Sequence, residues 1–224
     1  ILPTLESVFE YLKKQNYEYE VWVVNDGSRD NTAQVAADFA KEFPQLKLID
    51  NKPNKGKAKA VQQGMLAAQG DLRLFMDADN ATAIDTLDKL LPYINEGYGV
   101  VIASIGIKGA KISNPEPLYR QLFGKAGNLW IRFWAVPGIH DTQRGFKLFT
   151  KEATEKIFPE MRTFGWGFDV EVLALARKYG YKIKEVPIDW TNVAGSKLNI
   201  WAYPKTLFQT LKIWWNLTTK KYNE

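Results

Sequence analysis

Short apolar stretches alternate with amphipathic stretches along the first hundred residues of this chain of 224 residues. The apolar stretches predict strands at 21–24, 46–49, 72–76 and 100–103. Between them, apolar residues recur every three or four positions, which is typical of helices that bury one face. Such helices are predicted at 4–14, after Asp30 or Asn31, at 57–69 and from Ile84 onward. This alternation indicates an α/β fold with a mostly parallel, doubly wound sheet.

The second half of the chain has a different pattern. Helices are predicted at 117–137, 151–158, 169–179 and 200–217, and strands at 145–149 and 182–190. Pro187 within the last strand favours an edge of the sheet. Neither a repeat nor a linker is visible, so we expect one domain over 1–224. Because α/β units of this kind normally start with a strand and this chain starts with a helix, we expect a first strand upstream of Ile1.

Two aspartates, Asp77 and Asp79, follow the predicted strand 72–76. The alternation of side chains along an extended segment places both carboxylates on one side. Two negative charges this close repel each other unless a cation lies beside them. Mg²⁺ or a similar ion suits the pair, since it binds one or two carboxylates together with phosphate oxygens. The carboxyl end of a strand is also where open α/β sheets bind ligands.

Composition narrows the chemistry. The chain has no cysteine and one histidine, His140, which excludes disulfides and makes a structural zinc site implausible. The net charge of +5 suits a phosphate-bearing ligand, an anionic membrane surface or nucleic acid. The basic residues are scattered and match no nucleic-acid-binding motif, so nucleic acid is the least favoured partner. We expect no signal peptide at the start of this sequence, and no apolar run approaches the ~18 residues of a membrane-spanning helix.

Further motifs accompany the aspartates. They are Val23 to Thr32 (VVNDGSRDNT), Asn54 to Ala58 (NKGKA), Asp77 to Thr82 (DADNAT), Asp141 to Phe149 (DTQRGFKLF) and Trp166 to Glu171 (WGFDVE). In this order they resemble the inverting family-two glycosyltransferases, which have the GT-A fold. Within that family they are most similar to the dolichyl-phosphate β-glucosyltransferases. The resemblance implies transfer of glucose from UDP-glucose to a polyprenyl (dolichyl) phosphate, with Mg²⁺ or Mn²⁺ as cofactor.

The resemblance also implies a donor site. Asp26, beside Gly27, would contact the uracil, although Asp-Gly is also a common turn. Lys55, Gly56 and Lys57 stand at a helix start, where N–H groups and the helix dipole favour phosphate. We expect Lys57 to lie nearer the nucleotide than Lys55. Asp79 is the expected metal ligand, and Asp77 would reach the ribose, or the metal through water. Asp30 is expected to cap the next helix.

The acceptor would bind elsewhere. A polyprenyl phosphate is already anionic, so it needs a cationic clamp more than a base, and Arg suits that role. Arg144 and Arg120 are the expected clamp, with Gln143 beside them and Asp141 as a further catalytic group. The segment from Trp166 to Asp169 would close over the sugar, although the helix dipole alone could account for Asp169.

The predicted helix 200–217 has the pattern of a membrane-surface helix. Its apolar stripe consists of Leu207, Phe208, Leu211, Trp214 and Trp215. Lys205 and Lys212 lie beside this stripe, as in helices that bind at a lipid interface, although ordinary core packing would also explain it. We therefore expect a membrane-associated protein at the cytosolic face of the endoplasmic reticulum or at a prokaryotic cell membrane. The alternatives are a dolichyl-phosphate mannosyltransferase that uses GDP-mannose and a non-catalytic membrane-surface module. The sequence leaves the oligomeric state open.

Overall fold

The computed structural model describes residues 1–113, 118–191 and 202–222. Its helices are α1 (Leu2–Leu12), α2 (Thr32–Glu42), α3 (Lys57–Ala67), α4 (Leu87–Asn95), α5 (Leu118–Trp134), α6 (Lys151–Ile157), α7 (Phe168–Lys178) and α8 (Ala202–Thr218). Its strands are β1 (Val21–Asn25), β2 (Leu46–Asp50), β3 (Leu72–Met76), β4 (Val100–Ser104), β5 (Lys111–Ser113), β6 (Phe146–Thr150), β7 (Ile183–Pro187) and β8 (Asp189–Thr191). Short 3₁₀ turns, η1 (Ile84–Thr86) and η2 (Phe158–Glu160), precede α4 and follow α6.

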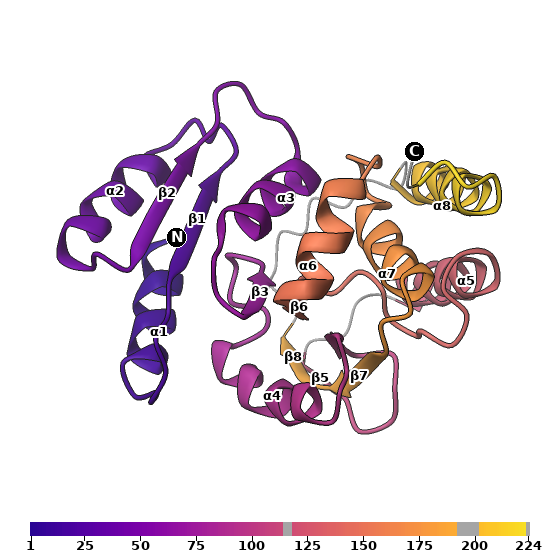
Figure 1. Cartoon of the computed structure of the whole chain (residues 1–224), viewed down its shortest axis with the longest axis horizontal. Coiled ribbons are helices and arrows are strands. Elements are labelled where there is room, and N and C mark those ends of the chain that lie inside the picture. The colour runs from indigo at the N-terminus through magenta and orange to yellow at the C-terminus, as the bar shows by residue number, and fades with distance from the viewer. Residues whose placement is uncertain (114–117, 192–201, 223–224) are drawn as a thin grey trace.

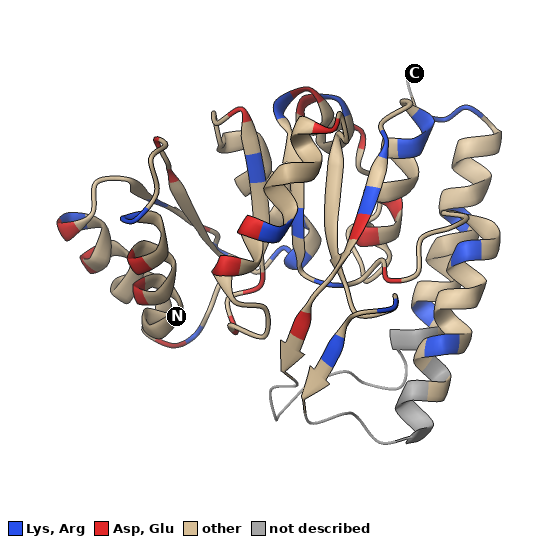
Figure 2. Cartoon of the chain, turned by 90° about the horizontal axis from the view of Figure 1, so that it is seen from below, with Lys and Arg blue, Asp and Glu red and all other residues tan. Residues whose placement is uncertain are grey.

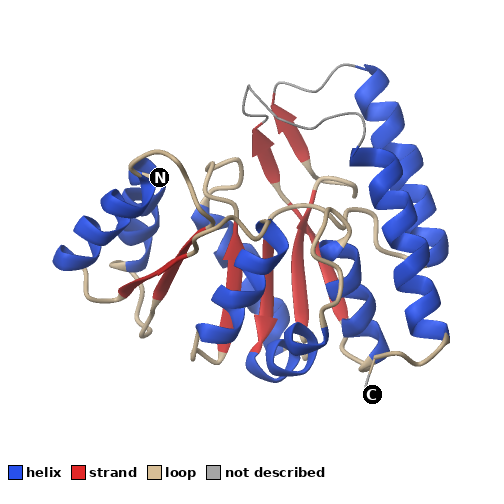
Figure 3. Cartoon of the chain, turned by 90° about the horizontal axis from the view of Figure 1, so that it is seen from above, coloured by secondary structure: helices blue, strands red, loops and turns tan. Residues whose placement is uncertain are grey.

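The strands form three groups in the described part of the chain. β1 pairs with β2, β5 pairs with β8, and the central sheet has the order β3-β6-β4-β7. The pairs β1–β2, β4–β7 and β5–β8 are parallel, whereas β6 runs antiparallel to both of its neighbours. Figures 1 and 3 show β1 and β2 with α1 and α2 on one side of the molecule and the central sheet beside them.

Most of the predicted elements are present within a few residues of their expected bounds. The predicted strand 182–190 is two strands in the structure, because β7 ends at Pro187 and β8 begins at Asp189. β7 lies at the edge of the central sheet, as Pro187 indicated. Three of the five strand pairs in the described residues are parallel, as expected for a mostly parallel fold, and the antiparallel β6 is the exception. In this mixed sheet β6 runs between β3 and β4, so Gly145 at its start meets the end of β3.

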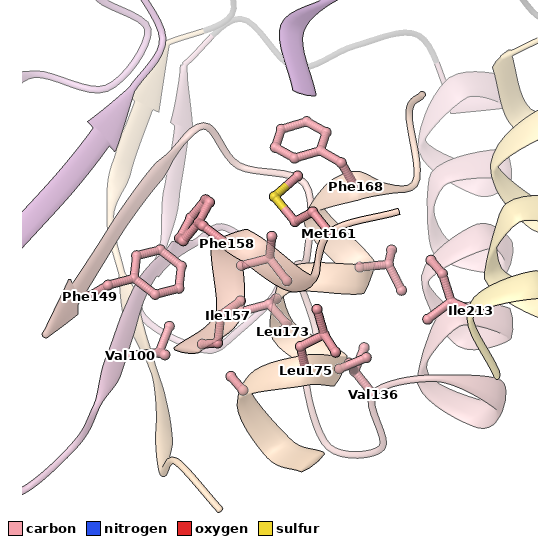
Figure 4. Close-up of a cluster of buried hydrophobic side chains, with 14 of the residues drawn as sticks. Val100, Val136, Phe149, Ile157, Phe158, Met161, Phe168, Leu173, Leu175 and Ile213 are labelled. Atoms are coloured by element: carbon pink, nitrogen blue, oxygen red, sulfur yellow. The ribbon is translucent and has the colours of Figure 1, made fainter. Parts of the chain in front are cut away.

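Two apolar clusters hold the layers together. One lies between the central sheet and the helices α6, α7 and α8, and Figure 4 shows Phe149, Phe158 and Phe168 among its members. The other packs α1 and α4 against the opposite face of the sheet, through residues such as Leu5 and Leu90. Every residue of 168–176 in α7 is buried. The central sheet is therefore covered on both faces.

Helices α5 and α8 lie side by side along the outer edge of the molecule (Figures 1 and 3). α8 packs inward through Thr206, Thr210, Ile213 and Asn216. Trp214 of α8 meets Trp134 of α5, with ring centroids 5.1 Å apart. No helix in the described ranges is both long and apolar enough to cross a membrane.

Candidate active site

Asp77 stands at the carboxyl end of β3, where it meets the start of α3. Its Oδ1 lies 2.6 Å from the Nζ of Lys57, the first residue of α3. Its backbone N–H donates to the carbonyl of Gly145, at 2.8 Å. A Cβ on Gly145 would lie 2.2 Å from the Asp77 carboxylate, so this carboxylate occupies the space that glycine leaves open. The structure thus brings together two of the predicted donor-site residues, Lys57 and Asp77.

Asp79 is more exposed than Asp77 and has no basic partner among the described residues. Its Oδ1 accepts a hydrogen bond from the N–H of Ala81, at 3.0 Å. Asn80 between them has a φ of 56°, so the chain turns sharply after Asp79. Asp79 as a whole residue is exposed. Two carboxylates, one of them exposed, match the oxygen ligands that Mg²⁺ and Mn²⁺ accept along with substrate phosphates. Asp79 is the better placed of the two for direct coordination, since Lys57 already binds Asp77.

Asp26 joins two motifs that lie about 30 residues apart in the sequence. Its two carboxylate oxygens accept the backbone N–H groups of Lys55 and Gly56, at 2.8 and 2.7 Å. Gly27 has a φ of 72°, and a Cβ there would lie 2.9 Å from the backbone N of Asn54. Asp26 therefore makes long-range contacts rather than a local turn. The predicted donor-site residues 26–27 and 55–57 form one continuous edge, which we call the donor edge.

Asp30 lies outside this edge. Its Oδ1 accepts the backbone N–H of Thr32, the first residue of α2, at 3.0 Å. Hydrogen bonds from the Thr32 hydroxyl and from this N–H lower the pKa of Asp30. The N-cap of α2 is Asn31, so Asp30 binds the first turn of the helix from one residue before the cap.

The turn before β6 holds Asp141 and Arg144 against each other. Asp141 is buried and accepts the N–H groups of Ile105 and Gln143, at 3.0 and 3.3 Å. Its Oδ2 also lies 3.2 Å from the Nε of Arg144. The guanidinium of Arg144 stacks 4.6 Å from the centre of the Trp190 ring in β8. Asp141 is thus engaged by several donors, and Arg144 has a fixed orientation on an aromatic surface.

Glu185 on β7 holds this turn in place through several hydrogen bonds. Its carboxylate accepts the backbone N–H groups of His140 and Asp141, at 2.8 and 3.0 Å. It also meets the Nδ1 of His140 at 2.9 Å and the hydroxyl of Ser104 at 2.8 Å. His140 therefore fastens this turn to β7 through its contacts with Glu185. We did not predict Glu185, because a single acidic residue in an apolar strand gives no sign of its distant partners.

Asp169 lies under the donor edge, at the start of α7. It is buried, and its Oδ1 lies 2.5 Å from the Nζ of Lys147, which is itself fully buried on β6. The same ammonium donates to the carbonyl of Arg144, also at 2.5 Å. Burial raises the pKa of Asp169, although Lys147 and Lys57 oppose that rise. We expected Asp169 to face the sugar, but here its carboxylate points to Lys147. Lys147 itself was not predicted, since its position in an apolar strand carries no signal.

The charge on Lys57 reflects three carboxylates. The surrounding protein atoms would by themselves lower its pKa. Asp77, Asp169 and Asp79 outweigh this effect and raise the pKa above its ordinary value. Lys57 therefore keeps its positive charge, beside the carboxylates of the predicted donor site. Its side chain is nearly half exposed, so a diphosphate could reach it.

The loop at 163–167 borders the site. The carbonyl of Phe164 lies 3.5 Å from where a Cβ on Gly56 would stand, and Lys59 covers the Phe164 ring. Trp166 is 49% exposed, and its carbonyl lies 3.4 Å from the Nε2 of Gln143. This loop therefore connects the donor edge with the turn at 141–145 before β6, where we predicted the acceptor phosphate to bind and which we call the acceptor turn.

Gln209 of α8 secures the same loop. Its Oε1 accepts the backbone N–H of Gly167, at 2.7 Å, and its side chain fills the space beside Gly165 and Gly167. Arg120 is the third residue of α5, but its side chain lies outside the described residues, so its predicted role stays a prediction. No cluster of three or more metal-ligating side chains occurs within the described residues. A metal would thus need further oxygen ligands from its substrate or from water.

The sequence of residues 1–158 matches the family model for glycosyl transferase family 2. The chain belongs to that family. The match covers the donor edge and the acceptor turn, from β1 to the end of α6. Family membership confirms the resemblance that the motifs indicated.

Curated relatives in this glycosyltransferase family share most of the chain. A dolichyl-phosphate beta-glucosyltransferase of Trichomonas vaginalis is 38% identical over 89% of this chain and 62% of its own length. The enzymes with the same name in Saccharomyces cerevisiae and Homo sapiens are 35% and 31% identical, over 88% and 87% of this chain. This chain covers 65% and 64% of those two relatives, so it spans less than two thirds of all three.

Solved structures share the fold. Mannosyl-3-phosphoglycerate synthase from Rubrobacter xylanophilus has a TM-score of 0.69 at 15% identity, and covers 99% of this chain with 71% of its own. Glucosyl-3-phosphoglycerate synthase from Mycobacterium tuberculosis, in complex with Mn²⁺, UDP and phosphoglyceric acid, has a TM-score of 0.68 at 14% identity, over 95% of this chain and 72% of its own. At these identities the comparison establishes the glycosyltransferase fold, GT-A, as expected.

Proposed function

We propose that this chain transfers glucose, with inversion, from UDP-glucose to a polyprenyl phosphate such as dolichyl phosphate. The observation that carries the proposal is the pairing of two unlike half-sites. A strand end with Asp77, Asp79 and Lys57 suits a nucleoside diphosphate with a divalent cation. A turn with Arg144 oriented by Trp190 and Asp141 suits a second phosphate. The names of the curated relatives support the choice of sugar and lipid.

The donor half would bind UDP-glucose along the edge 26–27 and 55–57. Lys57 and the N–H groups at the start of α3 would face the diphosphate, since a helix start favours anions. Asp79, with Asp77 behind it, would hold Mg²⁺ or Mn²⁺. That cation would neutralise the charge that develops on UDP as it departs.

The acceptor half would bind a nucleophile that is already ionised. A phosphate monoester is largely anionic at neutral pH, so no side chain has to remove a proton from it. The buried carboxylates agree with this view, because Asp141 is engaged by Arg144 and Asp169 by Lys147. Arg144 would orient the phosphate so that one oxygen attacks the anomeric carbon from the face opposite UDP, which inverts the configuration.

The outer face of α5 and α8 would rest on a membrane. Its exposed apolar residues are Leu122, Leu129, Phe133, Phe208 and Trp215. Neither helix contains an acidic residue, and both carry Lys or Arg, as the blue segments along this helix pair in Figure 2 indicate. Exposed aromatic and basic residues together are typical of helices at an anionic lipid surface. Such a surface would be that of the endoplasmic reticulum on its cytosolic side, or of a prokaryotic cell membrane.

A transfer assay tests the proposal. Labelled UDP-glucose, UDP-N-acetylglucosamine and GDP-mannose are each incubated with polyprenyl phosphate in the presence of Mn²⁺, Mg²⁺ or EDTA. We expect lipid-linked sugar from UDP-glucose only, and none with EDTA. Asp79→Asn should lower the rate by about two orders of magnitude, the scale of electrostatic stabilisation in transfer reactions. Asp71→Asn, at the opposite end of β3, is the matched control and should retain the rate. Transfer from GDP-mannose instead would favour the mannosyl alternative, and no transfer from any donor would contradict the proposal.

A further inference from the structure

The fully buried ammonium of Lys147 lies between the donor and acceptor halves of the candidate site. It approaches the Asp169 carboxylate and the Arg144 carbonyl at the same distance, 2.5 Å. It also lies 5.1 Å from the centre of the Phe75 ring on the neighbouring strand. A buried cation is costly unless every donor is engaged, so an apolar strand retains one only where it has specific partners.

Each partner of Lys147 leads to a different half of the site. Asp169 acts electrostatically on Lys57 as well as on Lys147, so two cations compete for this carboxylate. Lys57 in turn contacts Asp77 at 2.6 Å, beside the expected metal and diphosphate. The Arg144 carbonyl belongs to the acceptor turn, one residue before the glycine against which Asp77 packs. The charges therefore alternate from Asp77 through Lys57 and Asp169 to Lys147.

We propose that Lys147 is a positioning residue that couples the two halves by holding the Asp169 carboxylate and the Arg144 carbonyl at once. This inference rests on the proposed function, because it assumes that the two halves bind a donor and an acceptor. Because Lys147 pairs with Asp169, the ammonium of Lys57 can pair with Asp77. Because Lys147 also donates to the Arg144 carbonyl, it fixes the position of the acceptor turn relative to β6.

The two roles predict separable defects. In Lys147→Met, the buried Asp169 carboxylate keeps Lys57 as the other cation that acts on it, so Lys57 should shift from Asp77 toward Asp169 and donor binding should weaken. The Arg144 carbonyl also loses its donor, so acceptor binding should weaken. In the double variant Lys147→Met with Asp169→Asn, no carboxylate competes for Lys57. Donor binding should then recover while acceptor binding remains weak.

Arg73→Met is the matched control. Arg73 is a second buried cation, on the adjacent strand β3, which donates to the carbonyls of Met65 and Gly70 and pairs with Glu155 at 3.1 Å. It lies away from the strand end that carries Asp77. Its loss should lower stability, as the loss of Lys147 should, without changing ligand binding.

Calorimetric titration of the whole chain measures both halves without turnover. The probes are UDP with Mn²⁺ for the donor half and a short-chain prenyl phosphate for the acceptor half. We expect Kd to rise about tenfold for both probes in Lys147→Met, and to stay within twofold in Arg73→Met. The double variant should recover the UDP affinity and retain the tenfold loss for the prenyl phosphate.

Several results would overturn the coupling. One is recovery of both affinities in the double variant, which would mean that Lys147 only neutralises Asp169. Another is an unrecovered UDP affinity, which would mean that Asp169 does not compete for Lys57. A third is unchanged affinities in Lys147→Met. If that single variant does not fold, the double variant still decides between the first two outcomes. Because the titrations need no transfer, a wild-type chain that fails the transfer assay would contradict the proposed function and leave this test intact.

Discussion

At the scale of single residues, Gly145 shows how a missing side chain can shape a binding site. The Asp77 carboxylate occupies the volume where a Cβ would stand. Gly145 has no left-handed φ, so the requirement for glycine comes from its contact with Asp77 and not from backbone conformation. A methyl group at this position must therefore displace Asp77 itself.

Gly145→Ala should accordingly weaken binding of UDP with Mn²⁺ by about tenfold or more, a loss on the scale of one misplaced charge contact. Gly124→Ala is the control, because a Cβ at that helical glycine meets nothing within 4 Å. Calorimetric titration gives both affinities, and circular dichroism checks that both variants fold. Unchanged affinity in Gly145→Ala would mean that Asp77 does not contribute to donor binding.

Arg144 supports a second prediction at this scale. Its planar guanidinium lies over Trp190, and its Nε approaches Asp141. A lysine ammonium has neither the planar face nor the fork of N–H groups that can bind a phosphate through two hydrogen bonds. In Arg144→Lys, KM for polyprenyl phosphate should rise about tenfold, while KM for UDP-glucose changes little. Arg177→Lys, on the far end of α7, should leave both constants unchanged. A selective rise in the donor KM would assign Arg144 to the donor half instead.

At the scale of elements, the sequence predicted the strands and helices well because their apolar periodicity is strong. The strands at 72–76 and 100–103 and the helices from Lys57 and Leu87 appear within a few residues of the predicted bounds. The order and direction of the strands could not be predicted in the same way. The apolar pattern of 146–150 is the same whether the strand runs parallel or antiparallel to its neighbours, so the antiparallel β6 was not foreseen.

The candidate site divides along the same line. Residues in local motifs could be named from the sequence. Asp77 was named from its place after a strand and Lys57 from the resemblance of its motif, and the structure brings the two into contact. Residues that act through distant partners could not. Lys147 and Glu185 lie in strands, and only the pairing of those strands reveals what each side chain holds. Asp169 was named from its motif, but its partner and its burial come from tertiary packing.

Glu20 offers a test of how the elements are joined. Its carboxylate accepts the N–H groups of Gln69 and Gly70, just before β3, and binds Lys47 of β2. It thereby links the β1–β2 pair to the start of the central sheet. Burial alone would raise its pKa, but these donors outweigh burial and lower it to about 2 from an ordinary 4.5.

Because the folded-state pKa of Glu20 is depressed, its contribution to stability is complete above about pH 4.5 and is lost as the pH falls toward 2. Glu20→Gln should lower the free energy of unfolding by about 1 kcal/mol at pH 7, since Lys47 is partly screened by solvent. The variant should then lose less stability than the parent between pH 4.5 and 2. Urea unfolding at several pH values measures this difference. Parallel pH profiles for the two proteins would show that Glu20 is not the linking group.

At the scale of the whole molecule, the basic and apolar surface of α5 and α8 lies apart from the acidic residues of the candidate site. The described face of α5 and α8 carries basic and apolar groups, whereas the acidic pair Asp77 and Asp79 lies at the end of the sheet. Trp214 belongs to the predicted apolar stripe, but it packs against Trp134 between the helices. Phe208 and Trp215 are the members of that stripe with the most exposed side chains, at 71% and 55%.

Phe208→Glu combined with Trp215→Glu should therefore weaken binding to anionic liposomes by at least tenfold, because it removes apolar insertion and adds repulsion. Binding by the parent chain should also fall as salt is raised. Leu66→Glu introduces one negative charge at an exposed apolar residue of α3, and should leave liposome binding unchanged. Co-sedimentation measures all three proteins. If the double variant binds as the parent does, this helix face is not the membrane contact.

The complete burial of residues 168–176 in α7 has a consequence for how the chain can vary. A helix with one face in solvent tolerates replacements at every third or fourth position, so its record of accepted substitutions has a helical rhythm. In α7 that rhythm should vanish, because each of nine consecutive side chains meets packed protein. A saturation library screened for folded protein should show an unbroken block of intolerance over this helix. The neighbouring helix α8, which alternates between the core and the outer face, should show the rhythm clearly.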